Sequence, residues 1–178
     1  MSYDRKSPRL KNWNYGSNGL YFITINTKNR VHSFGEIQNN QMVYSAVGAI
    51  ANVLWFELQH RNKYVSLGEF AIMPNHLHGI IQLENPNNKP LERNSHIADK
   101  NETISEKMSA ISPKANSIST IIRSYKSAVT KHCNRLNLEF MWQSRYHDHI
   151  IRDEKSFLTI SQYIINNPKK WNEDESNL

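Results

Sequence analysis

Two histidines, His76 and His78, flank a single leucine in the run AIMPNHLHGIIQL at residues 71–83. The β-branched and apolar residues around them predict a strand, in which side chains at i and i+2 lie on one face of the sheet. We therefore expect the two imidazoles to lie together, with Leu77 pointing oppositely into the core. Neutral imidazole binds Mn²⁺, Zn²⁺ and Ni²⁺, so the pair predicts part of a metal site whose third ligand comes from elsewhere. The alternative is two histidines on the solvent face of a strand.

A tyrosine and an asparagine near the C-terminus have a spacing that complements the histidines. In SQYIINNP, Tyr163 and Asn167 are four residues apart and share one face of a predicted helix. They lie beside an apolar stripe formed by Phe157, Ile160 and Ile164, which Leu158 and Ile165 widen on the other flank. We expect Tyr163 and Asn167 to line the edge of a cleft. A phenolate beside a metal ion can attack phosphorus; the alternative for Tyr163 is a half-buried aromatic with its hydroxyl in water.

The remaining apolar patterns predict the scaffold that positions these residues. Strands are expected within 19–30, 63–74, 76–84 and 139–153, and a hairpin within 34–44 turns at Asn39 and Asn40. Helices are expected within 44–62, 118–136 and 153–168, the last with Asp153 as N-cap and Pro168 as its stop. This order predicts one α+β domain over 1–178, an antiparallel sheet with helices packed on it. The polar segment at about 85–117 predicts a flexible insertion with room for a short helix.

Composition narrows the class of protein. The 178 residues include 22 Lys and Arg against 16 Asp and Glu, a net charge of +6, which is compatible with a phosphate-rich partner. Cys133 is the only cysteine, which excludes an intrachain disulfide and a cysteine-rich zinc site and fits a reducing cytosol. No apolar run has the length of a membrane span and no secretory signal is apparent, so we expect a cytoplasmic protein without a membrane partner.

Five pieces of the sequence resemble one family in the same order. MPNHLHGII (73–81) resembles the HUH motif, histidine–bulky hydrophobe–histidine, of the small single-tyrosine HUH transposases, and the REP-associated tyrosine transposases in particular. The family's N-terminal strand and its approach resemble SPRLKNWNYGSNGLYFITINTKNR (7–30), and its middle helix resembles IIRSYKSAVTKHCNR (121–135). Its W-Q-x-x-[YF]-x-[DE]-H-x-[IV]-R segment resembles FMWQSRYHDHIIRDEKSF (140–157), and its tyrosine helix, which ends in Asn-Pro, resembles YIINNP (163–168). The resemblance spans most of the chain apart from 85–117 and the extreme C-terminus.

The resemblance implies a ferredoxin-like or RRM-like domain with the HUH motif on a central strand. It implies cleavage and joining of single-stranded DNA at hairpin-flanked sites through a 5′-phosphotyrosine link. His76, His78 and Asn167 would then bind a divalent ion, Mg²⁺ or Mn²⁺, and Tyr163 would be the nucleophile; zinc could occupy the same site without being the working ion. The residues expected to contact DNA are Arg123, Lys126, Lys131, Arg135, Arg145 and Arg152 at phosphates, Trp142 or Tyr146 by stacking on a base, and His149.

Several alternatives stay open on the sequence. Tyr125 and Tyr146 compete for the role of nucleophile, but relatives often have phenylalanine at the first position and vary between tyrosine and phenylalanine at the second. His147 and His149 repeat the i, i+2 spacing, although a structural or DNA-contact role is favoured for His149. The protein could instead be a non-catalytic nucleic-acid-binding domain, a domesticated relative, or a relaxase that uses the same chemistry, and it could act as a monomer or a homodimer.

Overall fold

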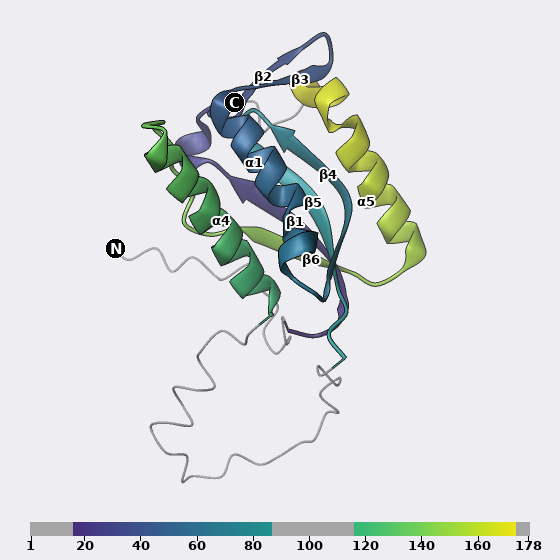
Figure 1. Ribbon diagram of the computed structural model, residues 1–178. Helices are drawn as coiled ribbons and strands as arrows, with labels where there is room; N and C mark the ends of the chain where they lie inside the picture. Colours follow the sequence, from purple (N-terminus) through teal and green to yellow (C-terminus); the bar gives the residue numbers. More distant parts are fainter. Residues whose placement is uncertain (1–15, 87–115, 174–178) are drawn as a thin grey trace, which may run out of the picture.

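The computed structural model describes residues 16–86 and 116–173 of the chain. The insertion expected at 85–117, with any short helix in it, lies almost wholly outside the described residues. Within them, a four-stranded antiparallel sheet has the order β4-β5-β1-β6, and a separate hairpin pairs β2 with β3 (Figure 1). The strands are β1 Gly19–Asn26, β2 Gly35–Gln38, β3 Gln41–Tyr44, β4 Val65–Met73, β5 His76–Leu83 and β6 His147–Ile151. The predicted α+β class is confirmed, and the histidine strand β5 is an inner strand, as expected.

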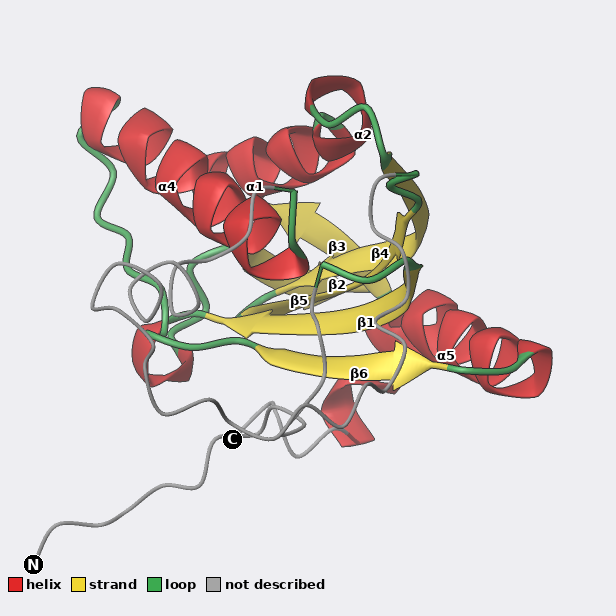
Figure 2. Cartoon of the chain, turned by 90° about the horizontal axis from the view of Figure 1, so that it is seen from below, coloured by secondary structure: helices red, strands yellow, loops and turns green. Residues whose placement is uncertain are grey.

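Helices cover both faces of the sheet. Two long helices, α1 Ala46–Phe56 and α4 Ile118–Arg135, lie over one face, and α5 Glu154–Asn166 lies against the other (Figure 2). The shorter elements are α2 Leu58–Arg61 and two 3₁₀ helices, η1 Lys28–Arg30 and η2 Asn167–Glu173. Only Arg152 and Asp153 separate β6 from α5, so the tyrosine helix starts directly beside the sheet.

Strand β1 shows how the two faces are divided. Its residues Tyr21, Ile23 and Ile25 are fully buried in the main core under α1 and α4. The alternate residues Leu20 and Phe22 pack in a second, smaller cluster with Ile80, Ile151 and Ile164 under α5. Because residues opposite one another on paired strands share a face, the second cluster lies on the same face as the histidines. The histidine pair therefore lies on a helix-covered face, not on a solvent face.

The predicted local signals hold at the hairpin and the helix starts. Asn39 and Asn40 have φ of 50° and 62°, the left-handed values that a tight two-residue hairpin turn requires. The Asp153 side chain accepts a hydrogen bond from the backbone N–H of Ser156 at 2.8 Å and so caps α5 as expected. In α4, all six residues of the predicted inward face are buried: Ile118, Ile121, Ile122, Tyr125, Val129 and Cys133.

Of two expectations for the last helix, one is wrong and one is confirmed. Leu158 and Ile165 do not widen the buried stripe, because they are 58% and 51% exposed; the stripe is continued instead by Ser161, which is small enough to pack closely against the sheet. The stop predicted at Pro168 is confirmed for the α-helix, although the chain then continues as a 3₁₀ helix. The α-helix ends at Asn166, but η2 follows at once and Pro168 lies in its first turn, where a missing N–H breaks no hydrogen bond.

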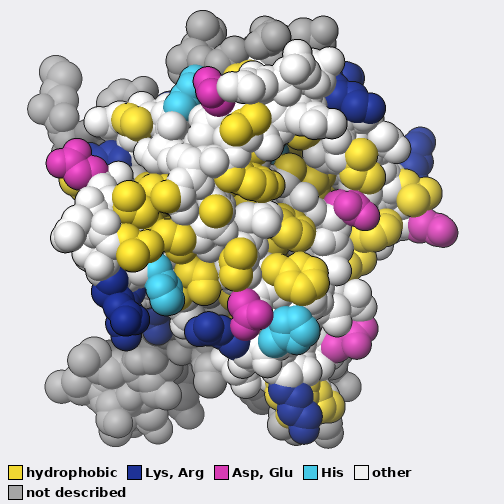
Figure 3. All heavy atoms as spheres, turned by 45° about the horizontal axis from the view of Figure 1, so that its top comes forward, with side chains coloured by type: hydrophobic (Ala, Val, Ile, Leu, Met, Phe, Trp, Pro, Cys, Tyr) yellow, Lys and Arg dark blue, Asp and Glu magenta, His cyan; other side chains and the backbone are white. Residues whose placement is uncertain are grey.

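The surface around the hairpin is mixed in character. Figure 3 shows hydrophobic side chains gathered near the middle of one face, with Lys and Arg side chains towards its margins. Exposed hydrophobic residues of the hairpin and of α1 include Val43, Tyr44, Val53 and Phe56.

None of the helices within the described residues is both long and apolar enough to cross a membrane.

Gly79 lets helix α1 lie close to the histidine strand. A Cβ atom at Gly79 would come within 2.4 Å of the Trp55 ring atom Cζ2 and 2.8 Å of Cε2, and Trp55 is fully buried. Neither contact can be accommodated without moving the indole, since such distances are well inside van der Waals contact. The residue after His78 is therefore required to be glycine by packing on the opposite face of the strand.

We expect Gly79→Ala to lower the free energy of unfolding by about 1–3 kcal/mol, the usual cost of overpacking a core. Urea denaturation measures the change. Trp55→Phe removes the two clashing atoms, so the double variant should recover part of the loss relative to the sum of the single changes. Ser66→Ala, an exposed position on β4, is the control. A Gly79→Ala midpoint equal to wild type would contradict this account of the packing.

Candidate active site

The two histidines lie together on β5 as expected, and they are buried. Their ring centroids are 4.5 Å apart, and the residues are 0% and 6% exposed. Trp171 of η2 covers His76, with ring centroids 6.0 Å apart, and Phe22 of β1 stacks on His78 at 5.2 Å. The pair is thus enclosed by the neighbouring strand and by the chain that follows α5.

His76 is held with one ring nitrogen left over. Its Nδ1 lies 2.8 Å from Oδ1 of Asn75, and an amide oxygen can only accept, so Nδ1 carries the proton. Its Nε2 therefore keeps a lone pair, and this atom is buried with no hydrogen-bond partner among the described residues. Burial, assisted by the Arg30 guanidinium, lowers the pKa of His76 to about 3. His76 is a neutral imidazole with a lone pair available, the form that binds a metal.

His78 links β1 to the tyrosine helix. Its Nδ1 lies 2.8 Å from the Thr24 hydroxyl, and its Nε2 lies 3.2 Å from the hydroxyl of Tyr163. The His78 and Tyr163 rings meet edge to face with centroids 5.3 Å apart, although 85 residues separate them in the sequence. When Thr24 accepts from Nδ1, the Tyr163 hydroxyl donates to Nε2. The predicted nucleophile and a predicted ligand are therefore in direct contact within one chain.

Asn167 is more buried than expected. It begins η2 and is only 3% exposed, so it does not line a cleft edge as expected. Tyr163, Asn167 and Trp171 follow at four-residue intervals, and the first and last of them contact His78 and His76. Asn167 lies between Tyr163 and Trp171 along the chain. Its Oδ1 is buried with no hydrogen-bond partner in residues 16–86 and 116–173.

This set of atoms fits a divalent cation. No group of three His, Cys, Asp or Glu side chains within the described ranges could hold a metal, so any third ligand from a side chain must be of another type. An amide oxygen is such a ligand, and two imidazoles with one amide oxygen suit Mn²⁺ and similar ions. The unpartnered Nε2 of His76 and Oδ1 of Asn167 are the observation in favour, because buried polar atoms without partners are uncommon in folded proteins.

Residues that the sequence did not single out orient the ligands. Asn75 and Thr24 fix the rings of His76 and His78 through Nδ1, the usual second contact of a metal-binding histidine. Thr27 anchors the loop after β1: its N–H donates to the Asn75 carbonyl at 2.9 Å, and its hydroxyl lies between the carbonyls of Val31, at 2.7 Å, and Asn75, at 2.9 Å. Thr24 could have been found from strand register alone. Trp171 could have been found by continuing the Tyr163–Asn167 spacing.

The predicted DNA-contact residues divide between two places. Arg123, Lys131 and Arg135 are exposed on α4, on the other side of the sheet from Tyr163. With Arg61 of α2 they line a groove of about 490 Å³ whose other residues are Ser124, Ser127, Ala128 and His132. Small side chains between positive ones leave room for a phosphate backbone to approach.

Lys126 and Trp142 are both half-buried, and with Lys131 and Arg135 they line a groove of about 700 Å³. Lys126 is half-buried, its ammonium donates to the Gln143 carbonyl at 2.6 Å, and burial lowers its pKa. The Trp142 indole donates to the Lys126 carbonyl at 3.1 Å and packs among Phe34, Tyr125 and Phe140. Both residues hold the segment before β6 against α4, so their first role is structural.

The residues on and around β6 stay candidates for nucleic-acid contact. Arg145, His149 and Arg152 are exposed. His149 lies directly opposite Phe22 on β1, and His147 lies opposite Thr24, so these histidines share the sheet face that carries His78.

The competing tyrosines are placed elsewhere. Tyr125 is 2% exposed, and its hydroxyl donates to the Ala51 carbonyl at 3.0 Å in the main core. Tyr146 is half-buried, with its hydroxyl 3.3 Å from the Ser119 hydroxyl. Of the three tyrosines considered, Tyr163 is the one whose hydroxyl meets a histidine of the pair.

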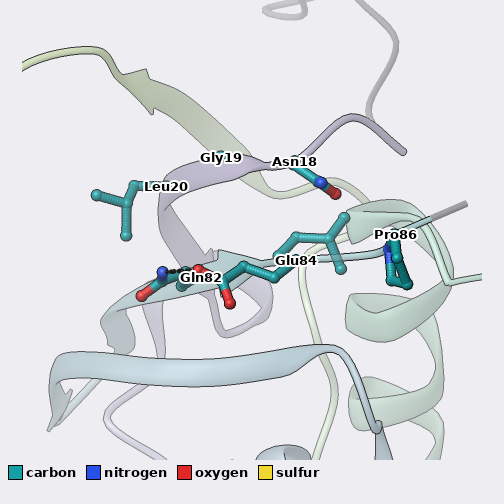
Figure 4. Close-up of a pocket in the computed structure, with 7 residues that line it drawn as sticks. Asn18, Gly19, Leu20, Gln82, Glu84 and Pro86 are labelled. Atoms are coloured by element: carbon teal, nitrogen blue, oxygen red, sulfur yellow. Dashed lines mark hydrogen bonds between the residues drawn. The ribbon is translucent and has the colours of Figure 1, made fainter. Parts of the chain in front are cut away.

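A hollow at the other end of the sheet does not belong to this site. It has a volume of about 570 Å³ and is lined by residues from the start of β1 and the end of β5 and beyond, including Asn18, Gln82, Glu84 and Pro86 (Figure 4). The strand register places Gly19 opposite Leu83 at this end and Asn26 opposite His76 at the other, so the length of β5 separates the two.

Comparison with known proteins gives a relative in sequence and a neighbour in structure. An uncharacterized protein of Haemophilus influenzae is 39% identical over 178 aligned positions, which cover 97% of this chain and 93% of the relative. A solved structure of a REP-associated tyrosine transposase bound to a REP hairpin aligns with a TM-score of 0.55 at 20% identity, over 96% of this chain and 74% of that one. At that identity the likeness shows a shared fold. No family model matches the sequence.

The buried neutral His76 predicts a loss of stability in acid for the metal-free protein. The unfolded chain takes up a proton near pH 6.5, whereas folded His76 resists until about pH 3. The unfolded state therefore binds more protons within this window, and the free energy of unfolding falls as the pH falls. Between pH 7 and pH 5, with EDTA present, urea unfolding should show wild type losing roughly 2 kcal/mol more than His76→Gln.

The exposed His60 supplies the matched control, since His60→Gln should lose as much stability as wild type over the same interval. Equal losses for wild type and His76→Gln would show that His76 is not held neutral by the fold.

Proposed function

We propose that this chain, which belongs to the same family as the uncharacterized Haemophilus influenzae protein, cleaves and rejoins single-stranded DNA through a bond between Tyr163 and a 5′-phosphate. The observation that carries the proposal is the 3.2 Å contact between the Tyr163 hydroxyl and Nε2 of His78. Two buried atoms with lone pairs and no hydrogen-bond partner in the described residues, Nε2 of His76 and Oδ1 of Asn167, support it. A phenol next to a pair of buried imidazoles, of which His76 is held neutral, is suited to phosphoryl transfer. The REP hairpin in the solved structure of similar fold supports hairpin-containing single-stranded DNA as the substrate class.

In this proposal the reaction is a transesterification. The Tyr163 oxygen attacks the scissile phosphorus in line, the bond from phosphorus to the 3′-oxygen breaks, and the proton lost by the phenol is balanced by one gained by the released 3′-hydroxyl. A second 3′-hydroxyl reverses the reaction and seals a strand. Because one phosphodiester is exchanged for another, no nucleotide cofactor is needed. The partial exposure of Tyr163, at 45%, leaves its ring accessible to a strand from solvent.

His76, His78 and Asn167 would hold the divalent ion, Mg²⁺ or Mn²⁺. When bound, such an ion neutralises charge on the phosphate and orients it. His78 has only one lone pair at Nε2, and Tyr163 donates to that atom in the present structure. The hydroxyl must therefore move off His78 before His78 can act as a ligand, and the contact seen here is a resting arrangement.

We further propose membership of the REP-associated tyrosine transposase class and a single catalytic domain over 1–178. The resemblance of the five sequence pieces and the shared fold support this assignment. A non-catalytic binding domain would explain the basic groove on α4, but it gives no reason for the Tyr163 hydroxyl to contact His78 or for Nε2 of His76 and Oδ1 of Asn167 to be buried without partners.

Tyr163→Phe should abolish covalent attachment without harming the metal site. Wild type incubated with Mn²⁺ and single-stranded hairpin oligonucleotides copied from the DNA flanking its gene should yield an adduct that survives denaturing electrophoresis. Tyr163→Phe should yield none, whereas Tyr146→Phe should retain it. The phenylalanine variant should bind Mn²⁺ at least as tightly as wild type, because the hydroxyl that competes for His78 is gone. Absence of the adduct from wild type, or its persistence in Tyr163→Phe, would contradict the proposal.

The basic groove on α4 predicts a salt-dependent contribution to DNA binding. In a Tyr163→Phe background without metal, replacing Arg123, Lys131 and Arg135 by alanine should weaken binding to a hairpin oligonucleotide and flatten its dependence on salt. Each lost phosphate contact changes the slope of log K against log salt by about 0.7 for single strands. Fluorescence anisotropy between low and moderate salt measures this slope. Lys155→Ala, at an exposed position on α5, is the control. Equal slopes for the triple-alanine variant and the protein with its groove intact would show that the groove makes no phosphate contacts.

A further inference from the structure

A third unpartnered polar atom lies on the strand next to the histidines. Oδ1 of Asn26 is buried and has no hydrogen-bond partner in the described part of the chain, like Nε2 of His76 and Oδ1 of Asn167. Asn26 is the last residue of β1, and the strand register places it directly opposite His76. A buried amide oxygen without a partner loses its hydrogen bond to water on folding, so a ligand that it binds would offset this loss.

Strand alternation places the Asn26 side chain on the same face as the histidines. Tyr21, Ile23 and Ile25 point into the main core, so the residues between and after them point to the α5 face. Thr24 confirms this direction, because its hydroxyl contacts His78 at 2.8 Å. Asn26 lies two residues beyond Thr24, just as His76 lies two residues before His78 in the antiparallel partner.

The hydrogen-bond pattern of the sheet brings Asn26 and His76 close. Thr27 donates to the Asn75 carbonyl, which makes those two opposite residues a hydrogen-bonded pair. The next pair, Asn26 with His76, is therefore of the type without mutual backbone hydrogen bonds, in which Cα atoms are about 4.5 Å apart and side chains are closest. The pair of Thr24 with His78 is of this same type, and its side chains are seen to touch.

We propose that Asn26 is a fourth member of the cation site, its Oδ1 binding the divalent ion together with His76, His78 and Asn167. This inference rests on the proposed function, because it concerns the same ion. It assigns the site two imidazoles and two amide oxygens, all uncharged. An uncharged ligand set leaves the full positive charge of the ion for an anionic group, here a DNA phosphate, and it binds the free ion only weakly.

Mn²⁺ binding to the full-length protein without DNA tests the assignment, with free Mn²⁺ followed by electron paramagnetic resonance. Asn26→Ala should raise the dissociation constant about tenfold, and Asn26→Asp should lower it by supplying a carboxylate. Asn52 of α1, half-buried on the opposite side of the sheet, is the matched control, and Asn52→Ala and Asn52→Asp should bind as wild type. Circular dichroism verifies that each variant is folded, and the aspartate variant keeps the test decisive if the alanine variant is not.

The outcomes separate this inference from the function on which it rests. If His76→Ala abolishes Mn²⁺ binding while both Asn26 variants bind as wild type, the cation site stands and Asn26 is not part of it. If wild type itself fails to bind Mn²⁺, the cation site and the assignment of Asn26 fall together. A weakened alanine variant with a tightened aspartate variant supports the assignment, since a merely structural asparagine would not respond in opposite directions to the two changes.

Discussion

The contact between a hydroxyl on α5 and an imidazole on β5 is the interaction on which the arrangement of this molecule depends. Tyr163 reaches His78 only because α5 lies against the sheet face opposite to the two long helices. That face can be covered because Ile80, Ile151 and Ile164 form a second apolar cluster there. Without that cluster β5 would have one wet face, and its histidines would be ordinary charged or solvated side chains.

Burial gives the histidines their chemical character. An imidazole in water titrates near neutral pH, but burial, assisted by the Arg30 guanidinium, lowers the pKa of His76 and favours its uncharged form. Asn75 and Thr24 contact Nδ1 of the two rings, so Nε2 of His76 is left without a partner, while Nε2 of His78 contacts the Tyr163 hydroxyl. The cost is a group of polar atoms enclosed without partners, which is unfavourable unless a ligand uses them.

Sequence reasoning succeeded where the signal was local and periodic. The alternation in β1 and the inward residues of α4 follow from patterns of period 2 and 3.6, and the hairpin turn follows from two asparagines, which tolerate positive φ; the structure has each of them. Sequence reasoning failed where the burial or the role of a residue depends on which other element packs against it. Leu158 and Ile165 fit the helical stripe by hydrophobicity, but the width of the stripe is set by the narrow cluster that α5 covers. Thr24, Asn26 and Asn75 carry no motif of their own, and their relation to the histidines appears only when the strands are in register.

The short link between β6 and α5 bears on how many molecules a complete site requires. With only Arg152 and Asp153 between them, the tyrosine helix packs against the sheet of its own polypeptide, and the hydroxyl meets the imidazole in cis. A centre assembled within one chain does not depend on an encounter between copies. If the proposed strand transfer uses Tyr163 from this position, turnover per molecule is independent of dilution, and a subunit whose tyrosine is removed is not rescued by one whose histidines are removed.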